Sequence, residues 1–493
     1  MSTTRTTAAP APATAPAGAA TPLCVDLDGT LLAGDCFWES LLTLLRHRPW
    51  LAVLLVPAVV GGVARVKQRL AELAPLDVAE LPYREAVLAY VRDQRAAGRR
   101  VVLATAADGR IADAVAAHLG MFDEVIASDG RANVKGAAKA AAIARRLDGQ
   151  GFEYVGDSRA DLPVWEAADR AHAVNPSPAL RARLAGAGRL GEVIQDGPAG
   201  RRAWHVLRAM RVHQWSKNLL LAVPMLVGQQ IFNPVQWGLL AVAFVAFSLC
   251  ASAVYLINDL LDLPADRQHP AKRHRPLASG ALSIPQGLAL VPGLLAAGLL
   301  LAALTLPGAA TAGVAAYVVL AMSYSLAVKG RAIIDVIWLA GLYALRLIIG
   351  GAAVAVFPSA WLLGFALFMF LSIAFVKRYT ELVDLAQRQG ERVAGRDYRV
   401  DDINLIGTVG PVSGYLAVVV FALYITSDDV LALYNRPELL WLGCPLLIYW
   451  LTRMWLKAHR GIMGDDPVMF TIKDPLSYAI GGAMALVVLA AAV

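Results

Sequence analysis

Apolar and polar residues are unevenly distributed along this chain of 493 residues. Residues 20–200 alternate short apolar runs with charged residues, which is typical of a soluble α/β domain. Residues 217–493 instead carry repeated apolar stretches of about 17–25 residues, the length that a helix needs to cross a bilayer. The pattern therefore predicts an N-terminal α/β domain followed by an all-α polytopic membrane domain.

Nine of these apolar stretches are expected to form transmembrane helices. If the N-terminal domain lies in the cytosol, nearly all Lys and Arg residues fall in the loops on that side, and the opposite loops carry Arg436 alone. This asymmetry follows the positive-inside rule, and it supports an odd number of spans with the N-terminal domain on the cytoplasmic side of the cell membrane. The nine stretches lie near residues 218–234, 236–257, 285–307, 310–328, 332–354, 360–379, 405–426, 437–455 and 475–493.

Composition agrees with this picture. Charged residues make up 17% of the chain and the mean hydropathy is +0.54, as expected for a membrane protein. The net charge of +7 is assigned to topology and lipid headgroups, because no basic stripe with interleaved aromatic residues indicates nucleic-acid binding. The four cysteines lack metal-site spacing and are expected to be small buried apolar residues. Residues 1–20 lack the basic and apolar regions of a secretory signal and are expected to form a disordered tail.

The first candidate site follows the apolar run Leu23-Cys24-Val25. Asp26 and Asp28 alternate with Leu27, so both carboxylates should point to the same side at the end of a strand. Two carboxylates this close repel each other unless a cation lies between them, and a hard ion such as Mg²⁺ prefers oxygen ligands. One carboxylate could then attack phosphorus while the other transfers a proton.

Three more polar groups follow in order along the same domain. Thr105 ends a second apolar run, Lys135 opens a helix, and Asp157 and Asp161 follow a third apolar run. Together with Asp26 and its neighbours, this set resembles the haloacid dehalogenase (HAD) phosphatase superfamily over about residues 20–195.

The HAD resemblance implies a Rossmann-like α/β fold and a role for each of these residues. Asp26 would be the nucleophile that forms an aspartyl-phosphate, and Asp28 would be the general acid and base. Thr105 and Lys135 would bind phosphoryl oxygens. One Mg²⁺ would be held by Asp26, Asp28 and Asp157, with Asp161 in support. An inactive relic of the superfamily is the alternative.

Residues 31–100 of this domain are expected to form a helical cap. Within the cap, Trp50–Val63 is strongly apolar, but it is too short to span a bilayer comfortably and contains Pro57. Two interpretations remain open: helices buried within the cap, or an interfacial segment that rests on anionic lipid and presents the site to a lipid-borne substrate. The basic residues that flank this segment are Arg46, Arg48, Arg65, Lys67 and Arg69.

The second candidate site lies where the second predicted span ends. At about 100° per residue, Asp262 and Asp266 lie about 60° and 20° from Asp259, so all three share one face if Pro264 does not end the helix. Three carboxylates at the end of a span are costly unless they bind cations, so we expect Mg²⁺ to bridge them to a diphosphate. The basic residues Lys272, Arg273 and Arg275 follow at once, which a merely solvated acidic loop does not explain.

The stretch from Asn258 to Asp266 resembles the first Asp-rich motif of the UbiA superfamily of intramembrane transferases, and the resemblance covers about residues 205–493. It implies a nine-helix fold in which Asp259, Asp262 and Asp266 hold one or two Mg²⁺. After the sixth span, the residues from Lys377 to Asp384 depart from the DxxxD motif that the superfamily usually carries there.

This departure, together with the residues Gln214–Asn218, resembles instead the branch that transfers phosphoribose to polyprenyl phosphates. The branch implies that Asp259 and Asp262 act in catalysis. The branch also suggests phosphate binding by Lys217, Lys377 and Arg378 and substrate contacts by Tyr324 and Glu381, and for these five residues ordinary cytosolic-side anchoring is the alternative. Lys272 and Arg275 are expected to neutralise phosphate charge, and Asn258 is expected to contact the substrate.

The two resemblances together imply a bifunctional membrane enzyme. Its membrane domain would use phosphoribosyl diphosphate and a polyprenyl phosphate, and its phosphatase would then remove the 5-phosphate. One alternative is an aromatic or quinone prenyltransferase with a phosphatase of separate substrate, and another is a non-catalytic membrane anchor for a phosphatase. A homo-oligomer is left open. The expected divisions are a tail at 1–20, the phosphatase domain at 21–195, a linker and basic entry helix at 196–216, and the transferase domain at 217–493.

Overall fold

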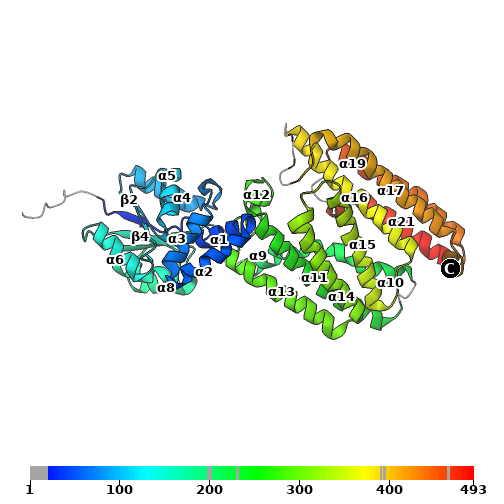
Figure 1. The fold of residues 1–493 in the computed structure, drawn as a ribbon, viewed down its shortest axis with the longest axis horizontal. Coiled ribbons are helices and arrows are strands. Elements are labelled where there is room, and N and C mark those ends of the chain that lie inside the picture. The colour runs from blue at the N-terminus through cyan, green and yellow to red at the C-terminus, as the bar shows by residue number, and fades with distance from the viewer. Residues whose placement is uncertain are drawn as a thin grey trace, which may run out of the picture. The chain divides into compact units, whose positions relative to one another are not determined.

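The structure is a computed structural model, drawn as a ribbon in Figure 1. The chain divides into two compact units. The first unit contains the residues up to Ala209 together with Asp259–Leu288, and the second contains Met210–Asn258 and the residues from Ala289 onward. Nearly all of the expected tail, and residues 197–201 of the expected linker, lie outside the described residues. These are 20–196, 202–228, 232–388, 391, 393, 396–463 and 467–492.

A six-stranded parallel sheet forms the centre of the first unit, with the strand order β3-β2-β1-β4-β5-β6. Parallel strands joined through helices confirm the predicted α/β fold. Because β1 lies between β2 and β4, the residues that follow these three strands meet at one edge of the sheet. The strands are β1 (Leu23–Val25), β2 (Val101–Asp108), β3 (Glu124–Ser128), β4 (Glu153–Gly156), β5 (Arg170–Val174) and β6 (Leu190–Ile194).

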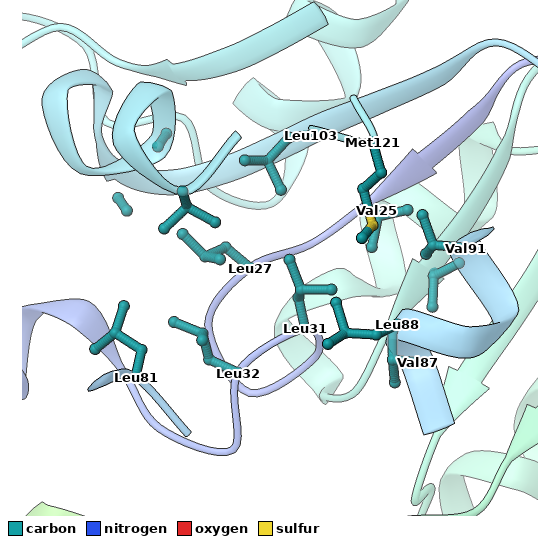
Figure 2. Close-up of a cluster of buried hydrophobic side chains, with 14 of the residues drawn as sticks. Val25, Leu27, Leu31, Leu32, Leu81, Val87, Leu88, Val91, Leu103 and Met121 are labelled. Carbon is teal, nitrogen blue, oxygen red and sulfur yellow. The ribbon is translucent and has the colours of Figure 1, made fainter. Parts of the chain in front are cut away.

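Helices cover both faces of this sheet. On one face, Val87 and Leu88 of α4 and Val115 of α5 pack against Val25 and the neighbouring strand residues, part of which Figure 2 shows. On the other face, the helices that follow β3, β4 and β5 bury a second apolar cluster that includes the fully buried Trp165. The helices are α4 (Glu85–Ala96), α5 (Gly109–Leu119), α6 (Ala137–Arg146), η3 (Arg159–Asp161), α7 (Leu162–Ala167) and α8 (Pro178–Gly186).

The segment expected to be a helical cap is helical, but α4 at its end packs against the sheet. The first cap helix begins after Asp35, whose side chain accepts the N–H of Phe37 at 2.9 Å and caps the helix. A small core of its own, formed around Leu44 and Leu70, joins the cap helices. These elements are α1 (Cys36–His47), η1 (Pro49–Leu55), α2 (Val56–Val60), α3 (Val63–Leu73) and η2 (Val78–Glu80).

The segment Asp259–Leu288 contributes α12 (Leu263–Gln268) and η5 (Lys272–His274) to the first unit. Both guanidinium Nη atoms of Arg267 pair with the carboxylate of Glu39 on α1, at 2.6 and 3.1 Å, and both side chains are largely buried. Gly280 has a φ of +72°, and a Cβ there would lie 2.4 Å from the Cβ of Ala33, so only glycine fits this close approach.

The second unit is all-helical, as predicted. In the described part of the chain, eight helical segments are long and apolar enough to cross a membrane, and they confirm eight of the nine predicted spans. Some of these segments join two elements. They are α11 (Pro234–Leu261), α13 (Ile284–Thr305), α14 (Gly308–Ser323) with η6 (Tyr324–Val328), α15 (Ile334–Val354), α16 (Ala360–Gln387), η7 (Val400–Asp402) with α17 (Ile403–Ile425), η8 (Pro437–Leu442) with α19 (Gly443–His459), and α21 (Pro475–Ala492). The shorter helices of this unit are α18 (Asp428–Leu433) and α20 (Pro467–Lys473), whereas α9 (Arg202–Ala209) belongs to the first unit.

Of the first predicted span, 218–234, the described residues up to 228 include two consecutive short elements, η4 (Val212–Ala222) and α10 (Val223–Val227), and residues 229–231 lie outside the described residues. Asn218 is buried here, and its side chain joins Ser248 of α11 at 2.9 Å and Arg346 of α15 at 3.2 Å. Pro224 then lies in the first turn of α10, where a missing N–H is tolerated.

Candidate active sites

The first site lies at the end of β1. Asp26 is buried, and its Oδ1 accepts the N–H of Leu27 at 2.8 Å. The Oδ1 of Asp28 accepts the N–H of Cys36 at 2.8 Å, so the chain turns back over the strand end. Gly29, which directly follows Asp28 in the sequence, has a φ of +80°. A Cβ at this position would lie 2.7 Å from a carboxylate oxygen of Asp157. This turn therefore requires glycine to bring the ends of β1 and β4 together.

Three carboxylates meet at this point. Asp26, Asp157 and Asp161 each offer an oxygen within 4.8 Å of the other two. Asp161 is held by the hydroxyl of Tyr154 at 2.9 Å and by the N–H of Ser158 at 3.1 Å. Such a rigid set of oxygen ligands fits a hard divalent cation such as Mg²⁺. Of the sequence-predicted ligands, the structure thus groups these three through their side chains.

A buried lysine compensates part of this negative charge. The Nζ of Lys139 lies 2.7 Å from Asp26 Oδ1 and 3.8 Å from Asp161 Oδ1, and it donates to the hydroxyl of Tyr154 at 2.8 Å. Sequence reasoning selected Lys135, which lines the cavity but precedes α6. Lys139 lies on α6, so its spacing of one helical turn from Lys135 was the signal that the sequence offered.

Burial shifts the protonation of these carboxyl groups. Desolvation raises the pKa of Asp26 to about 7, although the nearby Lys139 ammonium acts in the opposite direction. Desolvation and the neighbouring Asp161 raise the pKa of Asp157 to about 6. The pKa of Asp28 is also raised, chiefly by burial, which favours the protonated form that a general acid needs.

The site opens into a cavity of about 500 Å³. The cavity is lined by residues at the end of the sheet, by Lys67 of the cap, and by residues between 280 and 286 of the segment Asp259–Leu288. Lys67 also donates to the carbonyl of Ala106 at 2.7 Å. Thr105 is fully buried, its hydroxyl accepts the N–H of Ala107 at 3.0 Å, and it is not among the residues that line this cavity.

The second candidate site begins in the last turn of α11. The helix ends at Leu261, so the predicted single helical face does not continue to Asp266, which lies on α12. The structure nevertheless joins Asp259 and Asp266, because Arg275 Nη1 lies 3.1 Å from the first carboxylate and 2.5 Å from the second. Burial raises the pKa of Asp266. An arginine therefore lies where the sequence predicted a metal cation.

Asp262 and Lys272 were also predicted for this site, and they lie close in sequence to Asp259 and Asp266. In the described residues, the group of three with ligand spacing is the one at Asp26, and Asp262 is not part of such a group. Asp262 occupies the N-cap position of α12, where its backbone carbonyl accepts the N–H of Asp266 at 2.9 Å, and Lys272 begins η5.

Three substrate residues predicted in the second unit do meet. Arg378 is almost fully buried, and it pairs with Glu381 on α16 and approaches the hydroxyl of Tyr324 at 3.4 Å. Its Nε also lies 2.8 Å from Asp335, which in turn accepts the hydroxyl of Tyr398 at 2.7 Å. Sequence reasoning assigned no role to Asp335 or Tyr398, because 63 residues separate them and no local pattern connects them. Asn258 lies on α11, Lys217 on η4 and Lys377 on α16.

Comparisons with known proteins assign both units. A model of the UbiA prenyltransferase family matches residues 220–471, and a model of haloacid dehalogenase-like hydrolases matches residues 23–166. These families generally use Mg²⁺.

Relatives support this assignment along most of the chain. A protein of Sinorhizobium fredii called uncharacterized protein y4nM is 35% identical, over 94% of this chain and 90% of that protein. Nodulation protein NoeC of Azorhizobium caulinodans is 34% identical over 57% of this chain and 92% of its own length. Decaprenyl-phosphate phosphoribosyltransferase of Mycolicibacterium smegmatis is 35% identical over 56% of this chain and 89% of its own length. The chain is therefore a multi-pass membrane enzyme that belongs to the UbiA prenyltransferase family and carries an N-terminal domain of the haloacid dehalogenase-like hydrolases.

Proposed function

We propose that the membrane domain transfers 5-phosphoribose from phosphoribosyl diphosphate to a polyprenyl phosphate, and that the hydrolase domain then removes the 5-phosphate. The product would be a polyprenyl-phosphoryl-ribose. The observation that carries the transfer step is the buried pair Asp259 and Asp266 around Arg275, at the end of a membrane-length helix. The name of the mycolicibacterial relative supports the choice of substrates.

In the transfer step, the bond between ribose C1 and the diphosphate breaks, and a new bond forms from C1 to an oxygen of the lipid phosphate. Mg²⁺ held by Asp259, Asp262 and Asp266 would supply charge neutralisation for the leaving diphosphate. Arg275 already balances two of these carboxylates, and it can turn to phosphate oxygens when the metal balances them instead. Lys272 follows in the same basic run.

The second unit offers a different kind of recognition. Arg378 and Glu381 hold each other in position, and Tyr324 presents its hydroxyl to the same arginine. We assign Glu381 and Tyr324 to the hydroxyl groups of the sugar, and Lys217, Lys377 and Arg378 to phosphate. Asn258, in the last turns of α11, would orient the substrate.

In the hydrolase domain, Asp26 would attack phosphorus and form an aspartyl-phosphate, while Asp28 donates a proton to the leaving hydroxyl. Asp28 would then accept a proton from the attacking water. Lys139 favours the ionised form of the buried Asp26 carboxyl and opposes the effect of burial, and Lys135 and Thr105 are assigned to the phosphoryl oxygens. Mg²⁺ held by Asp26, Asp157 and Asp161, with the backbone of Asp28, would shield the charge of the incoming phosphate.

Fusing the two domains raises the effective concentration of one product at the next site, without requiring tight binding of the lipid intermediate. We further propose that both sites face the cytoplasm, because the basic loops of the membrane domain lie on the side of the hydrolase domain by the positive-inside rule.

The deciding experiment offers the purified protein and Mg²⁺ two substrate pairs. We expect a lipid product from phosphoribosyl diphosphate with polyprenyl phosphate, and none from an isoprenyl diphosphate with an aromatic acid. The reverse result would replace the proposed reaction with aromatic prenyl transfer.

Two variants separate the steps. Asp26→Asn should make the phosphorylated lipid and accumulate it, whereas Asp259→Asn should make no lipid product but keep phosphatase activity on a small phosphate ester. If Asp26→Asn forms the dephosphorylated lipid at the normal rate, the second step does not belong to this domain.

A further inference from the structure

The cap carries a cluster of exposed apolar side chains that the catalytic proposals do not use. We call it the apolar tip, and it consists of Trp50, Val53, Val56, Val59, Val60 and Val63 on η1, α2 and the start of α3. The exposed fraction of these residues runs from 60% for Val63 to 93% for Val60. A single exposed apolar side chain is ordinary, but here six exposed apolar side chains lie within fourteen consecutive residues.

Folding of the cap does not account for this patch. The inward residues of the same segment, Leu51, Ala52 and Leu55, already pack against Leu44 and Leu70 in the small core of the cap. The interpretation of Trp50–Val63 as helices buried within the cap is therefore wrong for the outward residues. They remain exposed after the cap core is complete, so they are available for a partner outside the first unit.

Charge around the apolar tip indicates the chemistry of that partner. Arg46, Arg48 and Arg65 are exposed at its two ends. Among the described residues, none of the three lies within ion-pair distance of a carboxylate. An apolar patch with a basic rim complements the interface of an anionic bilayer, where acyl chains lie next to phosphate groups. The chain also carries eight membrane-length helices, so the full protein is expected to be attached to a bilayer.

The apolar tip is directly connected to the phosphatase cavity. Val63 and Lys67 lie four residues apart on α3, which corresponds to about 6 Å along the helix axis. Lys67 lines the cavity together with Asp26 and Asp28. A bilayer seated on the tip would therefore place lipid headgroups beside the cavity opening.

We propose that the apolar tip inserts into the interfacial layer of an anionic phospholipid bilayer and presents the phosphatase cavity to the phosphate of a lipid-borne substrate. The membrane contact stands on the exposure and charge of the tip alone, and the consequence for the substrate rests on the proposed function.

The membrane contact is tested by a fluorescent probe in the full chain. Val60→Cys is labelled with an environment-sensitive dye in a Cys444→Ser background, because the other three cysteines are buried. The matched control is Gln150→Cys, an exposed position in the turn before β4, away from the strand ends that form the site. Both proteins are placed in vesicles of phosphatidylcholine with or without phosphatidylglycerol.

We expect the dye at position 60 to shift to the blue and to be quenched by lipids that carry a nitroxide at the headgroup end of the acyl chain, more strongly with phosphatidylglycerol. The dye at position 150 should show neither change. Equal behaviour of the two dyes overturns the proposal. A shift at position 60 that needs a high protein density but not anionic lipid also overturns it, because the partner is then a second copy.

The substrate consequence is tested by replacing Val56, Val59 and Val60 with serine. Hydrolysis of a lipid-borne phosphate in phosphatidylglycerol vesicles should fall about tenfold, whereas hydrolysis of p-nitrophenyl phosphate should not change. Equal rates on the lipid-borne phosphate overturn this part of the inference. If the protein hydrolyses neither compound, the proposed phosphatase function fails, and the dye experiment still decides the membrane contact.

Discussion

The three carboxylates of the phosphatase site should make Mg²⁺ binding depend steeply on pH. Protons and metal compete for the same oxygens, and burial raises the pKa of Asp26 to about 7 and that of Asp157 to about 6. Both values lie above the usual 3.8 of an aspartate. The perturbation is therefore a change of pH from 8 to 5.5 in the intact protein.

The expected size follows from the two values. At pH 8, Asp26 and Asp157 are about 0.91 and 0.99 ionised, so the site is ready for metal in about 90% of molecules. At pH 5.5 the fractions are about 0.03 and 0.24, so fewer than about 1% of molecules are ready. The Mg²⁺ concentration for half-maximal activity should rise about a hundredfold, which corresponds to about 2.7 kcal/mol.

The assay measures hydrolysis of p-nitrophenyl phosphate against Mg²⁺ concentration at several pH values. Calorimetry in buffers of different ionisation enthalpy should also show about 1.7 protons released per metal at pH 5.5 and about 0.1 at pH 8. Asp266→Asn is the control, because it alters the other acidic site and should keep the same pH dependence. A half-saturating Mg²⁺ concentration that stays within about threefold from pH 5.5 to 8 would refute the reasoning.

The same shifts predict how pH affects the metal-free protein. Because the pKa values of Asp26 and Asp157 are raised on folding, their contribution to stability is fully present below about pH 3.8 and is lost as the pH rises to about 7. Added Mg²⁺ should restore it above pH 7, since bound metal favours the ionised carboxylates. Hydrogen exchange of β1 and β4 at pH 5 and 8, with and without Mg²⁺, follows this change locally.

Three further variants test individual contacts. Lys139→Met removes the cation beside Asp26, so phosphatase activity should fall at least about a hundredfold and its pH optimum should rise, as a pH–rate profile would show. Arg275→Ala should raise the KM for phosphoribosyl diphosphate about tenfold in the transferase assay, but should tighten Mg²⁺ binding in the absence of substrate, as measured by calorimetry. Arg267→Leu leaves Glu39 buried without its cation and should cost about 3–5 kcal/mol, seen as faster proteolysis of the cap, with partial recovery in the double variant Arg267→Leu/Glu39→Leu.

Most of the fold could be predicted from the spacing of apolar runs and from the order of polar motifs along the chain. The spacing of apolar runs predicted the eight membrane-length helices because bilayer thickness, not tertiary contact, sets their length. The order of these polar groups along the chain predicted the parallel sheet, because Asp26 and Asp157 follow the neighbouring strands β1 and β4, and Thr105 lies in β2 beside β1.

The differences arise where tertiary contacts override local pattern. The stretch 218–234 has the composition of a span, but its described residues lie in the short elements η4 and α10, and Asn218 of η4 forms hydrogen bonds with Ser248 and Arg346. Lys139 could not be distinguished from Lys135 without knowing where α6 begins and which face it turns to Asp26. The pair Arg267 and Glu39 joins positions 228 residues apart, and no local pattern contains that information.

At both acidic sites, a basic side chain lies between two buried carboxyl groups. At the first, Lys139 lies between Asp26 and Asp161, and at the second, Arg275 lies between Asp259 and Asp266. Carboxylates that are buried close together would otherwise repel each other strongly or take up protons, because low-dielectric surroundings weaken screening. A resident basic side chain favours their ionised form, against the effect of burial, and holds them in place before a divalent cation binds. It also competes with that cation, so metal should bind most tightly when a phosphate is present to engage the lysine or arginine. Metal and phosphate binding are therefore expected to be mutually reinforcing at each site.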